Sequence, residues 1–134
     1  CANRDDTWLS PEVRRIYAEL FRMGLVRTIE TWQNGEMVGG VYGVSIGKFF
    51  AGESQFSRVR DAGKVAFASL FEMLRANRFQ LHDGQYLTPY LKQFGATEIS
   101  RTDFESKLLR AAAQPGAFRH PEEIRDRNEV SILS

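Results

Sequence analysis

The chain has little of the chemistry that binds metals or forms cross-links, because its 134 residues include one cysteine, Cys1, and two histidines. A single thiol cannot build an internal disulfide framework, so the fold must rest on burial of apolar side chains. Neither histidine lies in a cluster with metal-ligand spacing, so we expect no metal site. Apolar residues make up 43% of the chain, which is enough for one ordinary globular core.

The sequence also lacks a long hydrophobic run and an excess of either charge. No stretch of about 18 apolar residues is present, and no basic segment precedes an apolar leader, so we expect a cytoplasmic protein without a membrane span. Lys and Arg number 18 against 17 Asp and Glu, a net charge of +1. A protein that coats nucleic acid needs a sustained surplus of basic residues, so the sequence argues against this function and leaves a local basic patch as the contact for phosphate. Because the chain begins with Cys1 rather than Met, we expect a fragment or a processed piece.

Helix and strand signals alternate along the chain. N-cap residues, prolines and apolar periods predict helices over 11–23, 62–76, 89–94 and 103–113, capped by Ser10, Asp61, Thr88 and Thr102. Runs of β-formers between turn residues predict strands over 26–32, 37–46, 48–53, 79–83 and 96–99. Asn34-Gly35 is the strongest short hairpin signal and predicts a type I′ turn. Glycines inside the second strand indicate a bulge or a close approach of another backbone or of a ligand; they are Gly39, Gly40 and Gly43.

This order predicts an α/β fold of the α+β type. An antiparallel meander is followed by a strand–helix–strand unit, which gives one mixed sheet with helices on its faces. Residues 1–113 form the predicted domain, and charges and prolines from Gln114 onward predict a tail over 114–134 that is ordered poorly or only against a partner. The element order resembles the acetyltransferase-type GNAT fold, in which the turn before the long helix holds a pyrophosphate.

Polar side chains follow two strands that flank the long helix. Glu53 ends an apolar strand, and Asp83 and Gln85 follow the next one. Strand ends that meet at one crevice are where open α/β sheets bind ligands. Alone, Glu53 is typical of a solvated carboxylate, Asp83 of a turn residue and Gln85 of a surface amide. Their shared position at the ends of strands that flank one helix favours a site, in which a carboxylate near a carboxamide could orient an incoming amine or position a weak base. Ser54 and Ser57 have no histidine in a triad pattern, so a serine nucleophile is not expected.

Three cations, Arg58, Arg60 and Lys64, gather around the predicted start of helix 62–76. A helix N-terminus favours anions, so these residues are the best phosphate candidates, with a solvated basic loop as the ordinary alternative. The apolar residues of the helix predict either core or a large apolar pocket, and their period does not separate the two.

Six motifs follow one another along the chain: CANRDDTW, TIETWQNGEMVGG, GGVYGVSIGKFFAGESQFSR, Ala62-Gly63-Lys64, LHDGQ and FGATEISRTDF. Together they resemble the catalytic domain of the leucyl/phenylalanyl-tRNA–protein transferase family, from Cys1 to about Leu109. The resemblance implies a GNAT-like fold and transfer of Leu, Phe or Met from aminoacyl-tRNA to a protein's N-terminal Arg or Lys, which creates an N-degron. It implies no cofactor, with aminoacyl-tRNA as co-substrate.

The same resemblance implies roles for individual residues. Glu53 corresponds to the family's essential glutamate beside the aminoacyl ester, while Asp83 polarises Gln85, which assists the attacking amine. The three cations near the helix start would hold tRNA phosphates by charge-assisted contacts. The pocket for the amino acid and the terminal adenosine is expected to include Trp8, Tyr17, Val41, Phe50, Gly52, Gln55, Phe67, Leu70 and His82.

Two of these pocket residues depart from the family pattern. Gln55 stands where the pattern has Met, and His82 stands where it has Ile. A buried polar side chain costs about 1–3 kcal/mol unless it is hydrogen-bonded, so we expect an altered donor amino acid with a polar or basic side chain. His82 alternates to the opposite strand face from Asp83 and is equally expected as a packing histidine.

The family also has an N-terminal domain that helps to bind tRNA, and this sequence has no counterpart, so a missing domain or partner is expected. Two other functions stay open. One is a GNAT-like acyltransferase that uses acyl-CoA, which pyrophosphate binding by the loop before the long helix would favour. The other is a non-catalytic module that binds tRNA ends or protein N-termini, against which the joint presence of Glu53, Asp83 and Gln85 argues.

Overall fold

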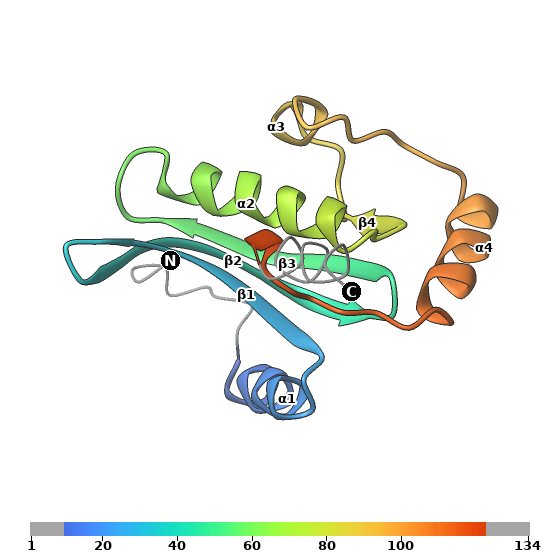
Figure 1. Cartoon of the computed structure of the whole chain (residues 1–134), viewed down its shortest axis with the longest axis horizontal. Coiled ribbons are helices and arrows are strands. Elements are labelled where there is room, and N and C mark those ends of the chain that lie inside the picture. Colours follow the sequence, from blue (N-terminus) through green and yellow to red (C-terminus); the bar gives the residue numbers. More distant parts are fainter. Residues whose placement is uncertain (1–9, 123–134) are drawn as a thin grey trace, which may run out of the picture.

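A four-stranded mixed sheet forms the centre of the computed structural model, which describes residues 10–122 (Figure 1). Three strands run antiparallel, and the short fourth strand is parallel to the third. In spatial order they are β1 (Val26–Gln33), β2 (Glu36–Ile46), β3 (Phe49–Ser57) and β4 (Leu81–Asp83). The predicted meander followed by a strand–helix–strand unit is confirmed.

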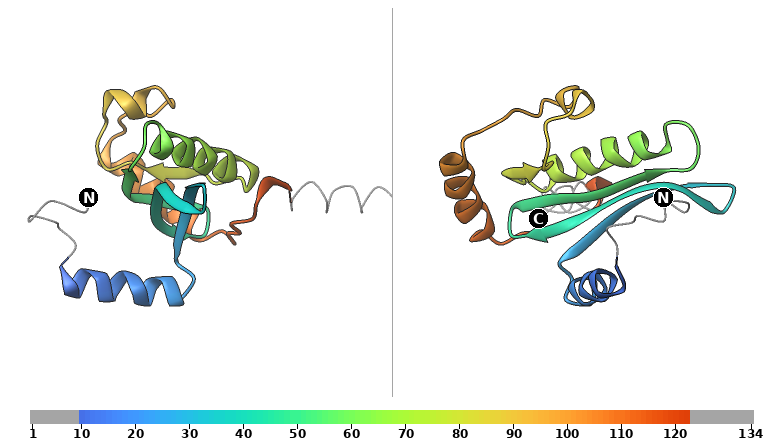
Figure 2. Two further views of the ribbon diagram at one scale, coloured as in Figure 1. Left: turned by 90° about the vertical axis from the view of Figure 1, so that its left-hand side faces the viewer. Right: turned by 180° about the vertical axis from the view of Figure 1, so that it is seen from behind.

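Helices lie on both faces of this sheet and beyond its β4 edge (Figures 1 and 2). The long helix α2 (Ala62–Ala76) covers one face, and α1 (Pro11–Arg22) lies on the other. Past β4 the chain forms the short α3 (Pro89–Lys92) and then α4 (Arg101–Ala112). Among residues 10–122, no helix is both long and apolar enough to cross a membrane.

The two strongest local signals produce the structures that they predict. Asn34 and Gly35 have φ angles of 51° and 78°, the left-handed pair that a type I′ turn requires. Gln33 pairs with Glu36 across this turn, so the hairpin closes with two residues. The helix predicted over 62–76 has the same bounds in the structure.

The start of α2 is capped differently from the prediction. Asp61 has a left-handed φ of 62°, and its side chain makes no capping hydrogen bond. Instead, Ser57 Oγ accepts the backbone N–H of Gly63 at 3.1 Å. Asp61 takes the N-cap position of α2, as predicted, but its carboxylate pairs with Lys64 Nζ, 2.9 Å away, and caps no backbone N–H.

Several predicted boundaries are also corrected. Residues 96–99 form no strand and are mostly exposed, because the chain after α3 runs past the outer edge of β4 toward α4 (Figure 1). β3 continues to Ser57, four residues past its predicted end, because β2 supplies partners as far as Gly39. The N-cap of α4 is Ser100 rather than Thr102.

The hydrophobic core lies between α2 and the sheet. Phe50 on β3 and Leu70 on α2 are 1% and 0% exposed. Burial of one such side chain stabilises a fold by about 1.5–3 kcal/mol. The other buried members of the cluster are Val41, Ala66, Phe67 and Leu74. In this structure four residues of α2, Ala66, Phe67, Leu70 and Leu74, therefore form core.

Two glycines of β2 lie at close contacts, Gly39 with α2 and Gly43 with the side chain of Phe50 on β3. A Cβ atom on Gly39 would lie 2.7 Å from Cβ of Ala62, and one on Gly43 would lie 2.6 Å from the ring of Phe50. Thr31 Oγ1 donates to the Ala62 carbonyl oxygen at 2.9 Å across the same contact. These glycines are sites of close approach, as their position in a strand predicts.

Residues 114–122 pack against the core. Phe118 stacks on Phe50 with ring centroids 6.0 Å apart. The side chain of the buried Asn77 exchanges two hydrogen bonds with the backbone of Arg119. This part of the chain is ordered against its own domain, whereas the sequence predicted a tail that is ordered poorly or only against a partner. The predicted domain boundary itself stays a prediction.

Replacing Gly39 by Ala tests the contact between β2 and α2. The new methyl group would overlap the backbone of Ala62, and such overpacking costs about 1–3 kcal/mol. We expect urea denaturation to show this loss in the free energy of unfolding. Thr28→Ala, at an exposed position on β1, is the control and should change it by less than about 0.5 kcal/mol. A Gly39→Ala protein as stable as the unmodified one would contradict the close packing.

Candidate functional site

One extra residue in β3, Glu53, interrupts the regular pairing with β2. Gly43 pairs with Gly52, whereas Tyr42 pairs with Ser54, so Glu53 has no register partner. A β-bulge of this kind bends a strand and re-aims a side chain, and bulges are frequent beside active sites. β3 pairs with β4 over three residues only, all of them before the bulge. Glu53 therefore lies where β3 separates from β4.

Gln85 and Asp83 reach this point from the end of β4. Gln85 Nε2 donates to the carbonyl oxygen of Gly52 at 3.0 Å and to Glu53 Oε2 at 3.3 Å. Asp83 Oδ1 accepts the backbone N–H of Gln85 at 2.8 Å and so supports the left-handed φ of 65° at Gln85. The structure brings together the two carboxylates and the carboxamide that the sequence singled out. Asp83 contacts the backbone of Gln85, however, and not its side-chain amide.

Tyr17 on α1 adds a phenol to the surroundings of Glu53. Burial, followed by a hydrogen bond to the Glu53 carboxylate, raises the pKa of Tyr17 to about 12. Tyr42 packs edge-on against Tyr17 with ring centroids 5.6 Å apart, and burial near Glu53 raises the pKa of Tyr42 as well. Both phenols stay neutral near pH 7, so Tyr17 serves as a donor to the carboxylate.

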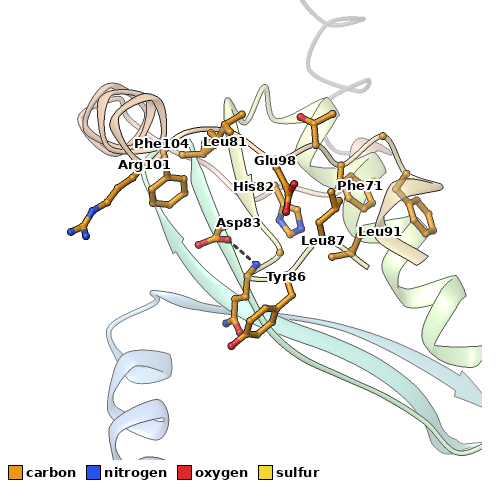
Figure 3. Close-up of a pocket in the computed structure, with 17 residues that line it drawn as sticks. Phe71, Leu81, His82, Asp83, Tyr86, Leu87, Leu91, Glu98, Arg101 and Phe104 are labelled. Atoms are coloured by element: carbon orange, nitrogen blue, oxygen red, sulfur yellow. Dashed lines mark hydrogen bonds between the residues drawn. The ribbon is translucent and has the colours of Figure 1, made fainter. Parts of the chain in front are cut away.

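A cavity of about 900 Å³ opens beside this group, along the outer edge of β4 (Figure 3). Asp83, Gln85 and His82 line one part of it. Apolar side chains line another part, among them Phe71, Leu91, Phe94 and Phe104, and Glu98 and Arg101 add charged groups to the lining. The cavity thus joins the polar group at the end of β4 to a wall of mixed character.

The predicted pocket residues lie in several places. Four of them belong to the buried core cluster: Val41, Phe50, Phe67 and Leu70. Gly52 lies at the bulge, next to Glu53, and Gln55 Nε2 donates to the Tyr90 hydroxyl at 3.4 Å. Of this set only His82 lines the cavity, and Trp8 lies outside the described residues.

Aromatic rings surround the imidazole of His82. The ring stacks on Phe50 with centroids 5.7 Å apart and meets Phe67 and Phe71 edge-on at 6.2 and 5.3 Å. Both ring nitrogens are buried, and neither has a hydrogen-bond partner of acceptable geometry among residues 10–122. Burial lowers the pKa of His82, and the Asp83 carboxylate and the Phe50 backbone oppose this shift without outweighing it. The imidazole is therefore neutral near pH 7.

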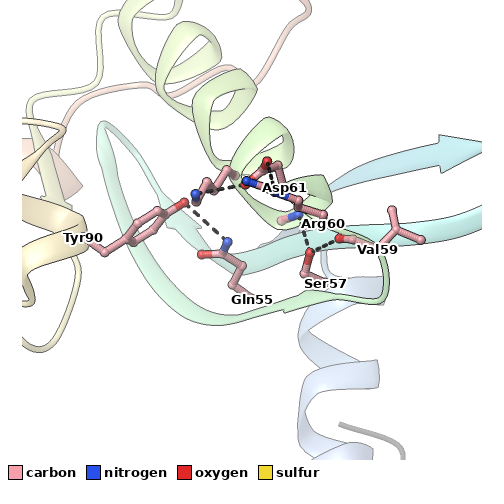
Figure 4. A network of polar contacts seen from close by, with 8 residues as sticks. Gln55, Ser57, Val59, Arg60, Asp61 and Tyr90 are labelled. Carbon is pink, nitrogen blue, oxygen red and sulfur yellow. Dashed lines mark hydrogen bonds and ion pairs between the residues drawn. The ribbon is translucent and has the colours of Figure 1, made fainter.

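The predicted phosphate site at the start of α2 is partly neutralised (Figure 4). Lys64 Nζ lies 2.9 Å from Asp61 Oδ1, and Arg60 Nε lies 3.5 Å from Asp61 Oδ2. The hydrogen bond and the charge of Asp61 raise the pKa of Lys64. Arg58 is exposed, and its side chain has no ion pair within the described part of the chain. Exposed pairs of this kind contribute little to stability, and the patch keeps a positive surplus.

The remaining chemical candidates do not form a centre. In residues 10–122, no group of three or more His, Cys, Asp or Glu side chains could hold a metal ion. Ser57 Oγ donates to the Val59 carbonyl oxygen at 2.7 Å and accepts from Gly63, so its hydroxyl serves the start of α2.

The sequence is similar to one protein family over most of its length. The model of the leucyl/phenylalanyl-tRNA protein transferase family matches residues 1–109. A protein of that name from Herpetosiphon aurantiacus is 51% identical over 118 residues, which are 88% of this chain and 62% of the relative. Relatives of the same name from Paramagnetospirillum magneticum and Caulobacter vibrioides are 47% and 49% identical, over 87% and 86% of this chain. The chain spans 56% and 53% of the length of those two relatives.

Replacing His82 by Ile tests the buried imidazole. The unfolded chain protonates this histidine near its ordinary pKa of about 6.5. The folded protein does so only at lower pH because burial lowers the pKa. The free energy of unfolding of the unmodified protein should therefore fall, relative to that of His82→Ile, as the pH is lowered from about 7.5 to about 5.5. Urea denaturation at both pH values measures this, and a constant difference would contradict the lowered pKa.

Replacing Glu53 by Gln tests the contact with Tyr17. Loss of the carboxylate should lower the pKa of Tyr17 from about 12 toward its ordinary value of 10.0, but not to that value, because burial is the larger cause. Phenolate absorbance during a pH titration measures the shift, and Tyr17→Phe assigns the transition. The stability that neutral Tyr17 contributes is complete below pH 10 and is lost as the pH rises through about 12. An unshifted Tyr17 would show that Glu53 does not accept its hydrogen bond.

Proposed function

This chain belongs to the leucyl/phenylalanyl-tRNA protein transferase family, and on that premise we propose that it is an aminoacyltransferase. It moves an amino acid from aminoacyl-tRNA to the N-terminal amine of a protein or peptide and so forms a peptide bond. The acceptor begins with Arg or Lys, and the reaction takes place in the cytoplasm. Because the relatives are longer than the matched part, tRNA binding also draws on a further domain or a partner.

The observation that carries this proposal is the hydrogen-bonded pair of Glu53 and Gln85 where β3 separates from β4. Gln85 Nε2 donates hydrogen bonds to the Gly52 carbonyl oxygen and to the Glu53 carboxylate. Gln85 Oε1 can therefore accept a hydrogen bond from the N–H of an incoming amine. The Glu53 carboxylate carries the negative charge that favours an ammonium group or positive charge developing on the amine. The Glu53 carboxylate and the Gln85 amide oxygen thus both act as hydrogen-bond acceptors for the incoming amine.

The proposed reaction needs little acid–base catalysis because an aminoacyl ester is already activated. The amine nitrogen attacks the ester carbonyl carbon, a C–N bond forms, and the bond to the ribose oxygen of tRNA breaks. The proton lost by the amine ends on the released ribose oxygen. The protein mainly holds amine and carbonyl together, an effect worth about 7–11 kcal/mol in well-oriented cases. Tyr17 and Asp83 orient Glu53 and Gln85, respectively.

We also assign the sheet to the GNAT-like class. The antiparallel meander, the long helix α2 and the parallel strand β4 support this assignment. The end of the β3–β4 pairing would then be the place where the acyl group lies between two strands.

The start of α2 favours tRNA over acyl-CoA as the source of the acyl group. A pyrophosphate would need free backbone N–H groups there. The N–H of Gly63 is already bound by Ser57 Oγ. The N–H of Ala62 is already bound by the Val59 carbonyl oxygen, and Asp61 adds negative charge. The exposed cations beside this turn suit the spaced phosphates of tRNA instead.

Replacing Glu53 by Gln also tests the proposed function. The chain is incubated with tRNAs charged with radiolabelled amino acids and with peptides that begin with Arg, Lys, Asp or Ala. We expect label in the Arg and Lys peptides, and a rate lower by about 100-fold or more for Glu53→Gln, because the charge beside the amine is lost. Gln85→Ala should act in the same direction.

Glu30→Gln is the matched control, since Glu30 on β1 accepts a hydrogen bond from Trp32 Nε1 away from the site. This variant should transfer at the rate of the unmodified chain. Label that comes from acyl-CoA but from no charged tRNA would overturn the proposed donor. Full activity of Glu53→Gln would show that the Glu53 carboxylate has no role in the mechanism.

A further inference from the structure

Two stretches of backbone border the cavity beside β4 (Figure 3). All three residues of β4, Leu81–Asp83, line it, although neighbouring side chains of a strand point to opposite faces of the sheet. On the other side, the consecutive residues 95–99 line it as well. The cavity therefore follows the edge of β4, and residues 95–99 run along its far wall.

This edge of β4 is open. Among the strands that the structure describes, β4 is the last of the sheet and pairs with β3 alone. Within residues 10–122, no backbone hydrogen bond joins β4 to residues 95–99, which form no strand. An open edge presents a row of backbone N–H and C=O groups, and proteins use such edges to bind an extended peptide as an added strand. The cavity thus has the backbone groups that a peptide needs.

One carboxylate on the far wall has no cation beside it. Glu98 lines the cavity, is exposed, and forms no ion pair within the described part of the chain. Arg101 lines the cavity too, but its Nε lies 2.8 Å from Glu105 Oε1 on α4. Asp83 adds a second negative charge from the β4 side. The charged part of the cavity therefore favours a cation.

The same cavity reaches the groups that hold the amine in the proposed reaction. Gln85 lines it, and Gln85 Nε2 donates to Glu53 Oε2 at 3.3 Å. Gln85 follows the C-terminal end of β4. A peptide that runs antiparallel to β4 along its open edge therefore begins beside Gln85 and leaves the cavity past Leu81. Its N-terminal amine lies where the carboxylate of Glu53 attracts it.

We propose that the acceptor protein binds here as an added strand, antiparallel to β4, and that Glu98 binds the side chain of its N-terminal Arg or Lys. This inference rests on the proposed aminoacyl transfer and names what holds its acceptor. A carboxylate forms strong, charge-assisted hydrogen bonds with a guanidinium or ammonium group. Backbone contacts read no side chains, so they suit acceptors that share only their first residue. The apolar lining at Phe71 and Phe94 leaves room for the transferred amino acid.

A change of charge at Glu98 tests the contact with the acceptor side chain. The measurement is kcat/KM for transfer to peptides that differ only in a first residue of Arg, norleucine or Glu, with the charged tRNA that gives most transfer. The unmodified chain should prefer Arg over norleucine by at least about 10-fold, because the charged side chain gains a charge-assisted hydrogen bond. Glu98→Gln should lose most of this preference. Glu98→Lys should transfer to the Glu peptide faster than the unmodified chain does.

Glu36→Gln is the matched control for these variants. Glu36 is exposed at the turn between β1 and β2 and does not line the cavity. This variant should keep the full preference for Arg. Circular dichroism checks that each variant is folded.

Methylation of the peptide backbone tests the added strand without any change in side chains. Backbone N–H groups of a strand point alternately to its two neighbours, so the N–H of either the second or the third peptide residue faces β4. At least one of these two N-methylated peptides should bind about 10-fold more weakly, because a backbone hydrogen bond is lost and its partner is left unpaired. A methyl group on the eighth residue, beyond the three residues of β4, should have no effect. Fluorescence anisotropy of peptides labelled at the C-terminus measures binding to the whole chain without tRNA.

The outcomes distinguish a failure of this inference from a failure of the proposed function. Transfer to the Arg peptide with a preference unchanged in Glu98→Gln would overturn the role of Glu98 and leave the transferase function intact. Equal binding of all methylated peptides would overturn the added strand in the same way. Binding that depends on Glu98 and on the peptide N–H groups, without transfer from any charged tRNA, would support the acceptor site and overturn the proposed function. Neither binding nor transfer would overturn both.

Discussion

The bulge at Glu53 is the constraint on which the site depends. A residue without a register partner shifts the alternation of every side chain that follows it on the strand. Gln55, which pairs with Val41, thereby comes to the α2 side of the sheet, where it meets Tyr90. The pairing of β3 with β4 ends just before the same point. One inserted residue therefore places the carboxylate and sets the side-chain pattern around it.

Neutral donors, rather than cations, hold the Glu53 carboxylate. Tyr17 and Gln85 contact it from α1 and from the end of β4, and neither cancels its charge. A lysine or arginine in their place would form an ion pair and weaken the attraction of the carboxylate for an amine. The cations of the chain lie instead at the start of α2, where Asp61 pairs with two of them. Negative charge thus lies at Glu53 and positive charge at the start of α2, a separation that suits the amine and the tRNA phosphates of the proposed reaction.

Features that weaken the fold occur near the site. Gln85 takes a left-handed backbone conformation, and His82 buries two ring nitrogens that have no hydrogen-bond partner of good geometry among residues 10–122. Strain and unpaired polar groups of this kind persist where the rest of a structure offsets their cost. The core of Phe50 and Leu70 and the packed segment around Phe118 provide that stability here. A stable core with strained or unpaired polar groups near one site is typical of a protein that binds a ligand at that site.

Local signals in the sequence determined much of this protein. Asn34-Gly35 produced the type I′ hairpin, and residues 62–76 produced α2 at the predicted bounds, because turn chemistry and helical periodicity act over a few residues. The places of Glu53, Asp83 and Gln85 after strands, together with the family resemblance, also predicted that these residues share one site, and the structure brings them close together. The absence of cysteines after Cys1 left burial of apolar side chains as the basis of the fold.

Only the tertiary structure decided how these parts meet. Residues 96–99 read as a strand but pair with no other strand in the described part of the chain. Asp61 takes the N-cap position of α2, but its carboxylate pairs with Lys64. The sequence likewise did not predict the bulge at Glu53 or the hydrogen bond from Tyr17. It also did not predict that the ring nitrogens of His82 are buried without a hydrogen-bond partner of good geometry among residues 10–122. Register, burial and contact depend on segments far apart in the chain, and local propensity carries no information about which of them will be neighbours.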